Sequence, residues 1–115
     1  MKTGLYYKKD KKVRLIARFA SASEPGGMPR SKYEYIAECW AYTRQLSQDQ
    51  IFEAAHFGKE ETRLFVLNYR NNLKIYDIIE YKGNYYEITR LDTQDDYNGE
   101  LFVYTKDAKH FSMND

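Results

Sequence analysis

The sequence predicts a mainly β domain: a small antiparallel β-barrel or sandwich of about six strands with one short helix. Three observations predict this fold class. Segments in which apolar and polar residues alternate recur along the chain, as expected for strands with a buried face. Aromatic residues, which pack well on a pleated sheet, make up 17% of the sequence. Turn signals separate the segments at intervals typical of small barrels and sandwiches.

The length of 115 residues suits one domain, residues 1–115, with one compact core. We expect the basic segment 1–12 and the tail 106–115 to be flexible, because neither carries a sustained apolar pattern. No apolar run approaches the roughly 20 residues of a membrane span, and the first residues lack the apolar centre of a signal peptide. A lone cysteine, Cys39, agrees with a reducing cytosol. These features predict a protein of the cytosol without membrane contacts.

The first predicted strand covers residues 13–19 and is half-buried. Its inner face is expected to hold Val13, Leu15, Ala17 and Phe19. Gly, Pro and Ser gather in residues 21–31, which predicts a mobile hairpin loop. The extended pattern resumes in residues 33–43, where apolar side chains fall on both faces. We therefore expect a strand buried on both sides, with Trp40 filling the core.

Residues 47–58 have the spacing of a helix instead of a strand. Ser47 is a candidate N-cap, and Gln50 three residues later completes a capping box. Apolar residues recur at helical spacing until Gly58, which is a typical residue after a helix end. So short a helix is marginal alone, so we expect it to lean on the sheet or on a neighbouring subunit.

The second half of the chain returns to strand patterns at residues 61–70 and 77–81. A Gly83–Asn84 pair then predicts a tight turn between two aromatic-rich runs. Asn98–Gly99 predicts a second hairpin, which joins residues 86–91 to residues 101–104. Together with the first half, these segments give about six strands.

Charge is balanced overall but not along the chain. The net charge is +1, yet residues 1–18 carry +6 (seven basic, one acidic) and residues 92–115 carry −4 (two basic, six acidic). The two ends are either separately solvated or make complementary head-to-tail contacts between copies. The candidate interface residues, which add a tyrosine-rich hairpin to these charged ends, are Lys8, Lys9, Lys11, Lys12, Tyr81, Tyr85, Asp95 and Asp96.

Residue patterns typical of catalysis or metal binding are missing from the sequence. His56 and His110 have no partner at ligand spacing, and Cys39 lies in an apolar strand, where a cysteine behaves as a small hydrophobe. Asp95 and Asp96 are better explained as an acidic hairpin than as a cation site. We therefore expect no catalytic residue, metal or cofactor, and no enzymatic activity.

Several short motifs, in their order, resemble the head-tail joining or head-closure proteins of tailed bacteriophages. Trp40–Ala41 matches a strand motif of that family, and Tyr69–Arg70 matches a strand end with the two residue types exchanged. Gly83, Tyr86 and Ile88 match a G-x-x-Y-x-I hairpin. The similarity covers roughly residues 13–104.

The resemblance implies a structural connector subunit of a phage or prophage, without catalysis or cofactor. Such proteins are similar in forming a ring, here expected to be twelvefold, below the portal and adaptor proteins and above tail-completion or tail proteins. The ring closes the head, retains packaged DNA through contacts that do not read its sequence, and offers the tail an attachment surface. This implies a place in the virion after assembly in the bacterial cytoplasm.

Segment 44–62 is the candidate loop that enters the channel, because it combines mixed charge with a marginal helix. Its candidate channel residues are Arg44, Gln48, Asp49, Glu53 and Lys59. Residues 21–31 are the second candidate.

An alternative function is a monomeric β-barrel that binds nucleic acid. Tyr81, Tyr85 and Tyr86 would stack on bases, and the basic N-terminus would contact phosphates. The acidic neighbours Glu80 and Glu87 would repel phosphate, which favours a subunit interface for this hairpin. Salt-dependent binding of short single-stranded oligonucleotides would separate the two functions.

Overall fold

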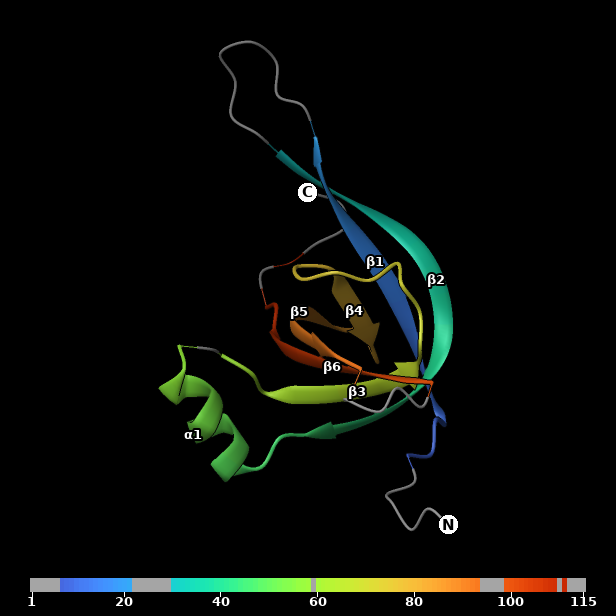
Figure 1. Ribbon diagram of the computed structural model, residues 1–115. Coiled ribbons are helices and arrows are strands. Elements are labelled where there is room, and N and C mark those ends of the chain that lie inside the picture. The colour runs from blue at the N-terminus through green and yellow to red at the C-terminus, as the bar shows by residue number, and fades with distance from the viewer. Residues whose placement is uncertain (1–6, 22–29, 59, 94–98, 110, 112–115) are drawn as a thin grey trace.

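The structure, a computed structural model, describes residues 7–21, 30–58, 60–93, 99–109 and 111. In this part of the chain six antiparallel strands close into a barrel in the order β1-β2-β3-β6-β5-β4, and one helix joins β2 to β3 (Figure 1). The elements are β1 (Lys11–Ser21), β2 (Arg30–Gln45), α1 (Gln48–His56), β3 (Arg63–Asn68), β4 (Ile78–Tyr81), β5 (Asn84–Asp92) and β6 (Glu100–Asp107). The predicted mainly β fold is confirmed, and it is a barrel.

The barrel closes through a short pairing between β1 and β4. This pairing joins Arg14 to Glu80, Leu15 to Ile79 and Ile16 to Ile78. β1 and β2, in contrast, pair along the whole of β1, so that their hairpin projects beyond the barrel (Figure 1). The loop expected at residues 21–31 falls at the end of this hairpin, and residues 22–29 lie outside the described part of the chain.

The main core fills the inside of the barrel. Its buried members come from every strand and from the β3–β4 loop: Val13, Leu15, Ala41, Phe65, Leu67, Leu73, Ile79, Tyr86, Ile88, Leu101 and Val103. β2 contributes mostly small residues, Ala37, Cys39 and Ala41, to this inner face. A six-stranded barrel is narrow, so small side chains on one wall leave room for the aromatic rings of the others.

Two expectations about the core are wrong. Trp40 is not buried: it is 55% exposed, because strand alternation places it on the face opposite Cys39 and Ala41. The outer face of β2 is therefore open at Trp40 and covered only near the end of the strand, where Tyr42 packs on apolar residues outside the barrel, so β2 is not buried on both faces along its length. Phe19 is also exposed, since it lies on the projecting hairpin beyond Ile16, the last residue of β1 that pairs with β4.

A second apolar cluster covers the outside of β3 and β6. It consists of Leu46, Leu64, Val66 and Phe102, with Tyr7, Tyr42, Ile51 and Tyr104 packed against it. The Tyr7 ring makes edge contacts with Tyr42 and Phe102, with centroids 5.2 and 5.1 Å apart. β3 is thus buried on both faces, and the cluster provides the place where α1 attaches through Ile51.

Some described residues of the two segments expected to be flexible belong to strands. Lys11 and Lys12 belong to β1, and Lys106 and Asp107 belong to β6. Further along, the Phe111 ring packs on Tyr33 and Tyr85. The strand pattern did not predict these two contacts because Phe111 lies outside any alternating run.

The predicted helix is confirmed, including its capping box. The Ser47 hydroxyl accepts the Gln50 amide at 3.2 Å, and the Gln50 side chain accepts the Ser47 amide at 3.0 Å. This helix is short, and within the described residues no helix has the length and apolarity to span a bilayer.

The first predicted hairpin turn is displaced by one residue. Tyr81 pairs with Asn84, so the central turn residues are Lys82 and Gly83, with φ of 52° and 80°. Two successive positive φ values match the twist of a two-residue hairpin, and glycine adopts such a conformation without steric cost.

Candidate functional site

The segment between β2 and β3 projects from the barrel and carries α1 at its centre (Figure 1). None of the helix residues is buried. Phe52 and Phe57 are 73% and 74% exposed, which is unusual for large apolar side chains. The segment is therefore formed by local capping and a few contacts, and it presents apolar rings to its surroundings.

The base of this segment is held firmly on the barrel. The Leu46 amide donates to the Thr62 carbonyl at 2.9 Å, and the Thr62 amide donates to the Thr105 carbonyl at 2.8 Å. These bonds continue the pairing of β2 with β3 and of β3 with β6. The two ends of the segment between β2 and β3 are consequently held next to each other on the barrel.

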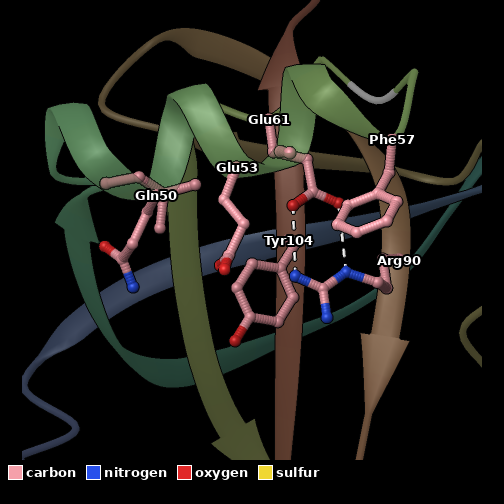
Figure 2. A pocket seen from close by; sticks show the side chains of 8 residues that line it. Gln50, Glu53, Phe57, Glu61, Arg90 and Tyr104 are labelled. Atoms are coloured by element: carbon pink, nitrogen blue, oxygen red, sulfur yellow. Dashed lines mark hydrogen bonds and ion pairs between the residues drawn. The ribbon is translucent and has the colours of Figure 1, made fainter.

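A charged cluster strengthens the same base. Glu61 is only 3% exposed, and its carboxylate accepts two bonds of 3.1 Å from Nε and Nη2 of Arg90 (Figure 2). It also accepts one of 3.2 Å from the Thr89 hydroxyl. The Arg90 guanidinium lies 3.8 Å from the centroid of the Tyr104 ring. Hydrogen bonding to Glu61 raises the pKa of Arg90, so this arginine stays charged.

A pocket of about 430 Å³ lies between α1 and the barrel. Leu46, Ala54, Phe57 and the Tyr104 ring supply its apolar lining. Glu53 hangs from α1 toward the ring of Tyr104, and Glu61 with Arg90 lies beside it (Figure 2). Because Arg90 already neutralises Glu61, the site combines apolar surface with the carboxylate of Glu53, a composition that suits a side chain with an apolar body and a cationic end.

Most of the predicted channel residues occur on this projecting segment. Arg44, the next-to-last residue of β2, donates to the Gln50 side chain at 3.1 Å, which links the strand to the helix. Gln48, Asp49 and Glu53 are exposed on α1. Lys59 lies outside the described residues.

Several predicted interface residues make contacts within the molecule. Lys9 forms an ion pair of 2.6 Å with Glu100, and Lys11 forms one of 3.1 Å with Asp10. Lys8 is exposed. Asp95 and Asp96 fall outside the described part of the chain.

The motif residues divide between core and surface. Ala41, Tyr86 and Ile88 are buried in the main core, Tyr69 is exposed just after β3, and Gly83 lies in the hairpin turn. Because Tyr86 is buried, its proposed role in stacking on nucleic-acid bases is wrong.

The other two rings of the tyrosine-rich hairpin pack within the molecule. Tyr81 packs against Phe65 and Tyr85 against Phe111. No pair of these three rings therefore forms an open platform for bases.

Sequence reasoning missed the cluster of Glu61, Arg90 and Tyr104. These residues are up to 43 positions apart, and each reads as an ordinary member of an alternating strand. The barrel brings them together because Arg90 and Tyr104 are partners in the pairing of β5 with β6. No motif or spacing along the sequence predicts that contact.

The fold and the site together are those of a small closed β-barrel with one projecting helical segment. Residues 8–108 match the model of the phage head completion protein family, and the chain belongs to that family. The resemblance inferred from the motifs is thereby confirmed. Phage head completion proteins are structural proteins that act with other head and tail proteins in the virion.

A solved structure with a similar fold supports the barrel assignment. Protein SF1141 from Shigella flexneri 2a, determined in solution, superposes with a TM-score of 0.72 over 91% of this chain and 97% of its own. The two sequences are only 12% identical, so the likeness concerns the fold alone. None of the curated proteins is significantly similar to the chain in sequence.

Proposed function

We propose that copies of this chain form a ring, expected to be twelvefold, between the portal and adaptor proteins above and tail-completion or tail proteins below. The ring closes the filled head, retains the packaged DNA and gives the tail its attachment surface. Before assembly the chain is a protein of the bacterial cytoplasm. The observation that carries this proposal is the projecting segment, which is fixed at its base but buries none of its helix residues.

In the proposed ring the outer side of α1 faces the channel. A segment that first holds DNA in the channel and later lets it pass must be firmly attached to the barrel and must bind phosphate only weakly. The Glu61–Arg90 pair provides the attachment. Asp49 and Glu60, both exposed, repel phosphate and prevent tight binding.

The experiment compares phage heads assembled with and without this chain. Nuclease-protected DNA per head should fall when the chain is omitted and should recover when purified protein is added back. Heads that keep their DNA without the chain would contradict the retention function. Electron micrographs of heads to which purified protein has been added back should show a closed ring at the connector.

The position of α1 is tested separately by photo-crosslinking. Benzoylphenylalanine in place of Asp49 should crosslink to packaged DNA after irradiation of filled heads. The same label in place of Asn71, an exposed residue between β3 and β4, is the matched control and should not. Failure of the Asp49 label to reach DNA in an incorporated ring would shift the channel role to residues 21–31.

A further inference from the structure

An exposed wall of the barrel combines aromatic rings with cations. On the outer face of β1 and β2, Lys12 pairs in register with Trp40 and Arg14 with Glu38. The Lys12 ammonium lies 5.4 Å from the centroid of the Trp40 ring, and Arg14 lies 5.6 Å from that of Tyr35. We call these five residues the β1–β2 wall.

The chemistry of the β1–β2 wall is that of a protein contact. Trp40 and Tyr35 are at least half exposed although water disfavours such rings. Trp, Tyr and Arg are the residue types that contribute most to binding at protein interfaces. Arg14 lies 3.3 Å from Glu38 and 3.8 Å from Glu80, and Lys12 lies 3.8 Å from Glu38, so the wall presents little unpaired positive charge to DNA phosphates.

The opposite side of the molecule has complementary chemistry. Within the closed strand order, β1 and β6 are separated by three steps, so they form opposite walls. β1 and β2 together carry +5 (seven basic, two acidic residues), whereas β4, β5 and β6 carry −3 (two basic, five acidic). The pocket beneath α1, with Glu53 and the Tyr104 ring, belongs to the acidic side.

We propose that the β1–β2 wall of one copy docks on the next copy, with Trp40 seated in the pocket beneath α1 and Lys12 beside Glu53. This inference rests on the proposed ring and names its subunit contact. Because each copy donates one surface and accepts at the other, the contact is heterologous and continues around a ring. The apolar lining receives the indole ring, and the carboxylate receives the ammonium that lies over it.

The occupant of the pocket is a second copy because one chain supplies both halves of the match. The exposed Trp40 ring with the Lys12 ammonium lies on one side of the barrel, and the apolar pocket with the Glu53 carboxylate lies on the other. Strands β1 and β2 as a whole are basic and strands β4, β5 and β6 are acidic, which also favours approach of these two sides over approach of like sides.

Charge exchange tests the contact in assembled heads. Lys12→Glu and Glu53→Lys alone should each lower the number of copies bound per head severalfold, measured by quantitative mass spectrometry. The double variant should restore binding to within about twofold of wild type, because every contact again joins opposite charges. Lys82→Glu, at the exposed hairpin turn, is the matched control and should bind normally.

Disulfide crosslinking then identifies the partner surface. In a Cys39→Ser background, Trp40→Cys combined with Ala54→Cys should give, after mild oxidation of the heads, a ladder of multimers on a non-reducing gel. Either cysteine alone should give no ladder. Circular dichroism of the purified variants verifies that the barrel is folded.

The outcomes separate this inference from the proposed ring. A ring of normal copy number without a ladder, or single variants that bind normally, would overturn the contact while the ring stands. Loss of binding in Lys12→Glu that Glu53→Lys does not repair would assign the wall to another partner, including DNA. Heads that carry no multimeric ring of this chain would refute the proposed function itself.

Discussion

Replacement of Arg90 by methionine should destabilise the barrel, because it leaves the buried Glu61 carboxylate without its main partner. Arg90 supplies two of the three hydrogen bonds that this carboxylate accepts. Methionine preserves much of the side-chain volume and keeps contact with the Tyr104 ring. The variant therefore removes the charge and the two bonds with little loss of packing.

The expected loss is about 3 kcal/mol of unfolding free energy. Removal of one partner of a buried ion pair costs roughly 3–5 kcal/mol. The lower end applies because the Arg90 side chain is 42% exposed and water reaches it. For 115 residues the unfolding entropy is about 240 cal/mol/K near 60 °C, so this loss lowers Tm by about 12 °C.

Urea unfolding followed by circular dichroism measures this change, with the thermal transition as a second readout. Arg14→Met is the matched control, since its exposed pair with Glu38 should contribute less than about 1 kcal/mol. Glu61→Gln added to Arg90→Met should recover part of the loss, because a neutral amide costs less to bury than an unpaired carboxylate. An Arg90→Met protein within about 0.5 kcal/mol of wild type, or no recovery in the double variant, would refute the reasoning.

Three further changes probe the rest of the structure. Trp40→Ala should cost the isolated protein at most about 1 kcal/mol, and native emission should resemble that of tryptophan in water, since the ring is exposed; a blue-shifted maximum in the monomer would contradict this. Ser47→Ala should raise the rate of amide hydrogen exchange in α1 about fivefold, because the cap stabilises the helix by about 1 kcal/mol, and should change the free energy of global unfolding little. An unchanged exchange rate would show that the capping box does not stabilise α1. Asp77→Ala should cost about 3 kcal/mol in urea unfolding, because the buried carboxylate accepts the backbone amides of Arg18 and Lys74 at 2.9 Å; a loss below about 1 kcal/mol would show that these amides find other partners.

The short motifs predicted the protein family, and the strand patterns predicted the positions of most strands of the barrel. Period-two alternation and, for β5 and β6, hairpin turn signals predicted strands at the places where β1 to β6 occur, because both follow directly from the geometry of pleated strands and tight turns. The capping box gave the start of α1 to the residue, since a cap is satisfied by atoms three positions apart.

Alternation states which residues share a face but not which face lies inside. Trp40 shares its face with Glu38, whereas Cys39 shares its face with Ala37 and Ala41. Hydrophobicity favoured Trp40 for the core, yet the narrow barrel accepts the small residues and leaves the large ring outside. The face of β2 that points into the barrel was therefore decided by steric fit against the opposite strands, and the size and polarity of the residues along β2 alone could not predict it.

Contacts between distant residues form the candidate site, and only the tertiary structure assembles them. By itself the sequence determined the strand segments, the capped helix between two of them and the uneven charge along the chain, all of which depend on neighbours in sequence. Closure of the barrel decided that Arg90 meets Glu61, that a pocket forms beneath α1, and that the basic and acidic strands become opposite walls. The physical reason is that strand order and register are fixed by the packing of the whole core, so no single segment carries them.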